Sequence, residues 1–168
     1  MKLKNMAFAV GLLAGAGIAM GAAAAPPPAG LMAPIHQFID SVNKGDMKAA
    51  GAPYASDVSI IDELPPYAWR GPHAFQDWVN DFGADAQKNG MTDTVVQLGR
   101  PTRADVNGTH AYVVAPATFK FKDHGKAMAE PAHMTFALTN DGGWKISSWA
   151  WTGGTPHPVA AAAAKAKP

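Results

Sequence analysis

The chain has 168 residues, of which 16% are charged and 48% are hydrophobic, a balance that excludes an intrinsically disordered protein. Fourteen lysines and arginines stand against thirteen acidic residues, so no basic excess indicates a nucleic-acid partner. Cysteine is absent, which excludes disulfides, thiol chemistry and thiolate metal sites.

The N-terminal segment has the order of a secretory signal. Lys2 and Lys4 precede an uncharged stretch over residues 6–25 that ends in a run of alanines. A basic start, an apolar centre and small residues at the end are typical of an exported precursor. We therefore expect a signal peptide over residues 1–24, a proline-rich linker over residues 25–33, and a periplasmic or secreted protein without stable membrane insertion. An uncleaved membrane anchor is the alternative.

The first half of the remaining chain is predicted to be mainly helical. Apolar residues recur at helical spacing from Ile35, and Lys44 is followed by a glycine that ends the pattern. Asp46 is a suitable N-cap for a second, short helix. A third helix is expected to begin at Pro72, which suits the first helical position, and to end at Asn89.

Alternating and β-branched segments predict a sheet. The expected strands cover residues 57–63, 94–100, 109–122, 127–139 and 144–152. Residues 64–70 contain two adjacent prolines and predict a loop, while Pro116 and Pro131 predict bends in long strands. Helices collected before an antiparallel sheet indicate an α+β fold. Residues 153–168 are of low complexity and predict a disordered tail.

This order of elements resembles the nuclear transport factor 2-like superfamily, in its SnoaL-like and ketosteroid-isomerase-like branches. The residues that carry the resemblance are D-x-x-x-x-D-E and R-G-P before the third helix and G-W-K-I on the last strand, within residues 34–152. The resemblance implies a cone, in which a curved antiparallel sheet wraps the N-terminal helices around an internal pocket. Because this fold hosts isomerases, dehydratases, cyclases and transport adaptors, it leaves the function open.

Some landmarks of the steroid isomerases of this fold have counterparts here. Asp46, Asp62 and Gly71 resemble the end of the first helix, the proton-shuttling aspartate and the glycine before the third helix, and Tyr54 matches a family tyrosine. The resemblance thus implies that Asp62 occupies the general-base position.

The groups that stabilise an enolate in those isomerases are missing. The positions of the two tyrosines correspond to Phe38 and Val79, and the second acid falls near Phe136. Since enolate chemistry needs hydrogen-bond donors at the growing negative charge, we do not expect steroid isomerisation.

Asp62 is the candidate catalytic residue. Alternation puts it on one strand face with Val58 and Ile60, where apolar neighbours would raise its pKa. The alternative is a structural aspartate that caps the following loop or pairs with Arg70. Glu63, on the opposite face, is expected to be a solvated rim residue.

Aromatic side chains are expected to line the pocket, with packing in the core as the alternative. The candidate ligand-binding residues are Phe38, Tyr54, Trp69, Trp78, Phe119, Phe121, Met134, Phe136, Trp149 and Trp151. Trp69 lies in the predicted loop after Asp62 and is expected either to close the mouth of the cone or to anchor the loop.

Neither a metal nor a cofactor is predicted. The six histidines lack the spacing of a metal site, and no phosphate loop or dinucleotide fingerprint occurs. On the outer sheet face, apolar residues predict a homodimer contact. They are Tyr112, Val114, Trp144 and Ile146.

Three functions remain open from the sequence. The first is an exported protein that binds a small hydrophobic or aromatic molecule in the pocket. The second is an isomerase, dehydratase or cyclase that uses Asp62 as general base. The third is a dimeric interaction domain with a filled cone. An open cavity that contains Asp62 would favour the second.

Overall fold

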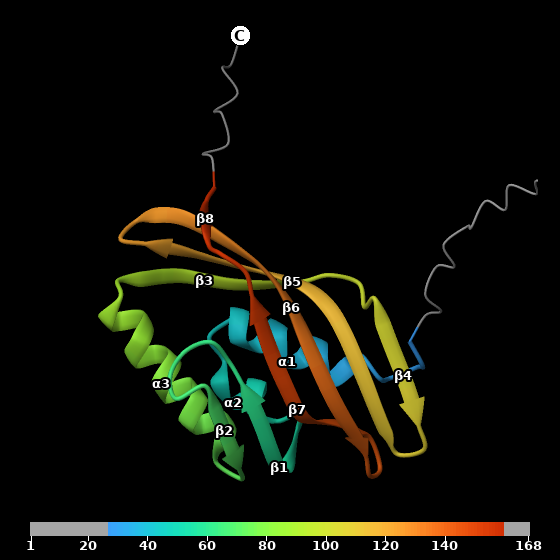
Figure 1. Ribbon diagram of the computed structural model, residues 1–168. Helices are drawn as coiled ribbons and strands as arrows, with labels where there is room; N and C mark the ends of the chain where they lie inside the picture. Colours follow the sequence, from blue (N-terminus) through green and yellow to red (C-terminus); the bar gives the residue numbers. More distant parts are fainter. Residues whose placement is uncertain (1–26, 160–168) are drawn as a thin grey trace, which may run out of the picture.

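The computed structural model describes residues 27–159 (Figure 1). Within this range the helices are α1 Ala33–Asn43, α2 Met47–Gly51 and α3 Ala74–Lys88. The strands are β1 Tyr54–Ile61, β2 Ala68–Gly71, β3 Met91–Leu98, β4 Arg103–Asn107, β5 His110–Asp123, β6 Lys126–Asn140, β7 Trp144–Gly153 and β8 His157–Pro158. No helix in the described range is long and apolar enough to cross a membrane. The predicted signal peptide lies outside the described residues.

The strands form one curved sheet in the order β2-β1-β7-β6-β5-β3, with β4 beside β5 and β8 beside β6 (Figure 1). The α+β prediction is confirmed, but the sheet is mixed rather than antiparallel, because β1 and β7 run parallel. The helix α3 and strands β3 to β6 lie between these two strands in the chain. So long a connection permits parallel pairing, which a tight hairpin does not.

Prolines mark the positions where the two longest strands change neighbours. β5 pairs with β4 before Pro116 and with β3 after it, while β6 pairs with β8 before Pro131 and with β7 after it. Proline has no N–H to donate to a neighbouring strand. The carbonyls of Pro116 and Pro131 instead accept hydrogen bonds, each of 2.8 Å, from the N–H groups of Gly99 and Gly154.

The helices form close to where the sequence predicts them, but α3 begins at Ala74, after His73 as N-cap, so Pro72 precedes the helix and does not occupy its first position. α1 buries Ile35, Phe38 and Ile39 on one face, as the helical spacing requires. Asp46 caps α2, and its Oδ1 accepts a 2.9 Å hydrogen bond from the N–H of Ala49. α3 lies against β1 and β2 (Figure 1) and buries Trp78 between itself and the sheet.

Three short strands are absent from the prediction. β2 pairs with β1 directly after the two prolines, so the predicted loop over residues 64–70 is largely the turn of a hairpin. β4 pairs with the first half of β5. β8 lies in the predicted tail, of which residues 153–159 remain attached to the sheet. With two to five residues each, these strands are too short to show an alternating pattern.

An irregularity in β7 changes the side of the sheet that one residue faces. The pairing of β6 with β7 shifts register between Ala137 and Leu138. A bulge of this kind breaks the alternation of side chains. As a result Ile146 is fully buried in the core, and the prediction that it lies on the outer face is wrong. Trp144 is half-buried and packs against that core.

Candidate functional site

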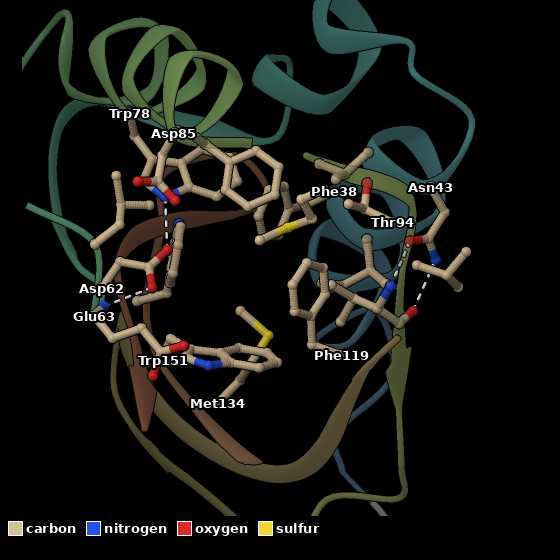
Figure 2. Close-up of a pocket in the computed structure, with 18 of the residues that line it drawn as sticks. Phe38, Asn43, Asp62, Glu63, Trp78, Asp85, Thr94, Phe119, Met134 and Trp151 are labelled. Atoms are coloured by element: carbon tan, nitrogen blue, oxygen red, sulfur yellow. Dashed lines mark hydrogen bonds between the residues drawn. The ribbon is translucent and has the colours of Figure 1, made fainter. Parts of the chain in front are cut away.

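A cavity of about 330 Å³ lies between α1, α3 and the curved sheet and opens to solvent (Figure 2). Its wall is formed by apolar side chains from all three layers and by a few polar ones. Figure 2 shows Asp62, Glu63 and Trp151 on one side, with Asn43 and Phe119 facing them across the open space.

Six of the ten candidate ligand-binding residues line this cavity. They are Phe38, Trp78, Phe119, Met134, Trp149 and Trp151. Their rings contact one another at the edges of the space: the Trp78 and Trp149 centroids are 5.1 Å apart at 89°, and those of Phe119 and Trp151 are 6.2 Å apart at 83°. Edge-to-face contacts of this kind hold aromatic walls in place.

The other four candidates lie elsewhere. Tyr54 and Phe136 are buried in the core behind the cavity. Trp69 is buried on β2 and its Nε1–H donates a 2.8 Å hydrogen bond to Asp81 of α3, so it anchors β2 and does not close the mouth. Phe121 stacks on a cavity residue but does not itself line the space.

Asp62 lines the cavity and is the first residue after β1. Its Oδ2 accepts a 2.7 Å hydrogen bond from Nε1–H of Trp78, and its Oδ1 accepts one of 2.7 Å from the N–H of Glu63. Burial raises the pKa of Asp62 above its ordinary value, while these two hydrogen bonds lower it and the nearby Glu63 charge adds to the rise. The net direction is upward because the loss of solvent outweighs the hydrogen bonds.

The contacts of Asp62 match one of its two expected structural roles, loop capping, and not the other, an ion pair with Arg70. Among the described residues it makes no ion pair with Arg70 or any other cation. It does accept a hydrogen bond from the backbone N–H of Glu63, which is a modest form of loop capping. The carboxylate is therefore partly structural, and it also faces open space.

Glu63 does not lie on the face opposite Asp62, as alternation predicts, although its side chain is exposed, as expected of a residue at the rim. Strand β1 ends at Ile61, so Asp62 and Glu63 belong to the hairpin turn, and both line the cavity. Burial, the charge of Glu130 and a hydrogen bond to Glu130 raise the pKa of Glu63 to about 7. Glu63 therefore keeps a proton for part of the time near neutral pH.

Glu130 is the buried member of this pair and was not singled out by the sequence. It lies on β6 with 2% of its surface exposed. Its Oε1 accepts a 3.0 Å hydrogen bond from Nε1–H of Trp151. Both carboxyl groups sit directly over Gly153, where a Cβ atom would overlap an oxygen of each. Gly153 leaves room for the two carboxyl groups. Its place beside them depends on the register of the strands, so the sequence alone could not reveal it.

The indole and side-chain amide donors of the cavity wall are already engaged. Trp149 donates to the Tyr54 hydroxyl at 2.7 Å, and burial raises the pKa of Tyr54 well above its ordinary value, so that phenol stays neutral. Asn43 donates to the carbonyl of Val96 at 2.8 Å and accepts from its N–H at the same distance. Phe38, which corresponds to one of the isomerase tyrosines, lines the cavity with an aromatic ring, whereas Val79 and Phe136 do not line it.

A sequence model of the SnoaL-like domain matches residues 31–151. The chain belongs to the SnoaL-like domain family. No curated protein sequence matches it significantly.

Solved structures share the SnoaL-like fold at low sequence identity. Hexachlorocyclohexane dehydrochlorinase LinA-type3 from Novosphingobium barchaimii LL02 has a TM-score of 0.63 and 17% identity, over 76% of this chain and 89% of that one. A ketosteroid isomerase-like protein from Erwinia carotovora atroseptica SCRI1043 has a TM-score of 0.60 and 14% identity, over 76% and 96%. These similarities confirm the cone fold of the nuclear transport factor 2-like superfamily.

The SnoaL-like cavity of this chain offers carboxylates and aromatic rings, and little else that is polar. Within residues 27–159 no group of three metal-ligating side chains converges. A carboxylate in an apolar wall can remove a proton, and a second carboxyl that holds a proton can return one. The site is thus equipped for proton transfer to and from an apolar molecule.

Proposed function

We propose that the cavity binds a small hydrophobic or aromatic molecule and that Asp62 removes a proton from it as general base. The observation that carries the proposal is the place of Asp62: a half-buried carboxylate without a cationic partner among the described residues, in the wall of an open apolar cavity. Its raised pKa makes it a stronger base than a solvated aspartate. The open space also argues against a filled cone that serves only as an interaction domain.

Elimination, as in a dehydratase, fits this wall better than enolate isomerisation. Asp62 would take the proton from carbon, the C–H electron pair would form a double bond, and the leaving group would depart with its own pair. Glu63, whose pKa is raised to about 7, lies in the same wall and would protonate the leaving group. LinA-type3, which has the same fold, is named for a dehydrochlorination, and this analogy of fold supports the reaction class.

The base can be tested before the natural substrate is known. The probe is 5-nitrobenzisoxazole, a small aromatic molecule whose ring C–H is removed by carboxylate bases. The N–O bond then breaks, and the coloured 2-cyano-4-nitrophenolate forms. We expect saturable turnover by the wild type and a loss on the order of 10²- to 10⁴-fold in Asp62→Asn.

The control is Asp57→Asn, which removes the same charge from an exposed position of β1 outside the cavity. It is expected to leave turnover unchanged. Probe binding without turnover that depends on Asp62 would instead support a binding protein, the second candidate. A probe that neither binds nor reacts would contradict the proposed function.

We also propose export and a homodimer. The N-terminal pattern supports export, and N-terminal sequencing of the exported protein should start near Ala25; a chain that keeps Met1 in the membrane fraction would contradict this. Exposed Tyr112, with half-buried Val114 and Trp144, supports a dimer through the outer face. Light scattering should give twice the monomer mass, and a strict monomer at micromolar concentration would contradict it.

A further inference from the structure

The charged groups in the cavity wall all have one sign. Asp62, Glu63 and Asp85 line the space, and no lysine, arginine or histidine does. Figure 2 shows these three carboxyl groups on the same side of the cavity, next to Trp78 and Trp151. Within residues 27–159 none of the three forms an ion pair. Their negative charge is therefore uncompensated by the protein part that the structure describes.

The indole N–H groups of the wall cannot serve a negatively charged or carbonyl-bearing ligand. Trp78 donates to Asp62, Trp151 to Glu130, and Trp149 to a buried tyrosine hydroxyl. A ligand that offers only acceptors would have to break one of these bonds or to reach the Thr94 hydroxyl across the cavity from the carboxyl groups (Figure 2). A ligand that offers donors meets carboxylate oxygens with free lone pairs.

The aromatic rings add a second attraction for the same kind of ligand. The rings of Trp78 and Trp151 border the cavity beside the carboxyl groups, and the ring of Phe119 lies across the open space from them. Aromatic faces carry negative electrostatic potential and attract organic cations, most strongly where water is excluded. Carboxylates and aromatic faces together thus favour positive charge on an apolar body.

We infer that the cavity selects a hydrophobic cation: a ring-sized apolar molecule that carries a protonated amine. This inference rests on the proposed function only in placing a small ligand in this cavity, and it specifies the charge of that ligand.

Proton release is a consequence that can be measured. A positive charge beside a carboxyl group lowers its pKa. Glu63, with a pKa of about 7, would therefore release part of its bound proton when an ammonium group binds near it at neutral pH. The titratable groups that face it are Glu130 on β6 and Asp62 in its own turn, and the element β7 contributes only Trp151 and Gly153 there.

Three probes with the same naphthalene body separate charge from size. Isothermal titration calorimetry is carried out on the full chain with 2-naphthylmethylamine, 2-naphthylmethanol and 2-naphthoate at pH 7. We expect the amine, as its cation, to bind roughly tenfold more tightly than the alcohol, with the carboxylate weakest. The binding enthalpy of the amine should vary with the ionisation enthalpy of the buffer, because a proton is released.

Two variants test whether Glu63 causes the preference for the amine. Glu63→Gln should reduce the advantage of the amine over the alcohol and abolish proton release, whereas Asp57→Asn, with the same change in net charge, should alter neither. Equal binding of amine and alcohol, or tightest binding of naphthoate, would overturn the inference and leave the proposed function standing. Failure of all three probes to bind would overturn both.

Discussion

Glu63 and Glu130, the only two glutamates of the chain, bring their carboxyl groups together over Gly153, where an oxygen of each would overlap a Cβ atom. One belongs to the turn after β1 and the other to β6, so the contact exists only in the folded protein. Since Glu63 holds a proton near neutral pH that it would lose in the unfolded chain, this contact links folding to pH.

The first prediction concerns this linkage. The pKa of Glu63 is raised from 4.5 to about 7 on folding, so the folded state binds the proton more tightly than the unfolded state. The free energy of unfolding should fall as pH rises from about 4.5 to about 7 and then level off. Glu63→Gln should melt close to the wild type at pH 4.5 and above it at pH 8.

Glu130→Gln is the companion variant for this prediction. The glutamine oxygen can still accept from Trp151, and its amide can donate to Glu63, so the pKa of Glu63 should fall toward its ordinary value. Thermal melts across pH, with Asp57→Asn as the matched loss of one charge, measure both effects. If the difference in melting temperature between the wild type and Glu63→Gln does not change with pH, the raised pKa of Glu63 is refuted.

Gly153→Ala tests the geometry of the same pair. A Cβ atom at this position would overlap one oxygen of Glu130 and one of Glu63, and Glu130 is buried and has little room to move. We expect a destabilisation of about 1–3 kcal/mol, as for other overpacked sites. Gly83→Ala is the control, because nothing lies within 4 Å of a Cβ there and alanine favours the helix. Chemical denaturation gives both values, and equal stability of Gly153→Ala and wild type would count against the contact.

Tyr54→Phe probes the support behind the cavity. The Tyr54 hydroxyl accepts the buried Nε1–H of Trp149, whose ring forms part of the wall. Phenylalanine leaves that N–H without its acceptor, which should cost about 1–3 kcal/mol of unfolding free energy. Tyr67→Phe, at a residue with 59% of its surface exposed, should change stability little. Urea denaturation of both variants measures the free energy of unfolding. An unchanged value for Tyr54→Phe would show that water replaces the hydroxyl as acceptor.

Trp78→Phe should make Asp62 a stronger base. The variant keeps an aromatic ring in the wall but removes the donor to Oδ2, which lowers the pKa of Asp62 in the wild type. The pKa of Asp62 should therefore rise further. Carbon-13 NMR titration of the carboxyl group measures this, and an unchanged or lower pKa would show that the hydrogen bond does not govern the charge.

The spacing of apolar residues and the positions of turn residues were sufficient to predict the helices and the long strands. The spacing of Ile35, Phe38 and Ile39 predicts α1 because a helix buries one face, and this depends on local residues alone. The parallel pairing of β1 with β7 depends on a contact across most of the domain, which no local pattern encodes. The bulge that buries Ile146 is likewise set by the packing of two strands.

The site was predictable only where local patterns place its residues. Asp62 and six cavity residues follow from the resemblance and from alternation along the strands. Alternation fails at Glu63, since a turn has begun there, and it says nothing of Glu130, which only the register of β6 and β7 brings beside Gly153.

The most direct test of the account is the titration of the Asp62 carboxyl group by carbon-13 NMR, in the free protein and with 2-naphthylmethanol added. The free protein should titrate above the ordinary value of 3.8, because burial opposes the charge. The neutral ligand should raise the pKa further by excluding water from the cavity. A pKa at or below 3.8 that does not respond to the ligand would contradict the assignment of Asp62 as the base of this cavity.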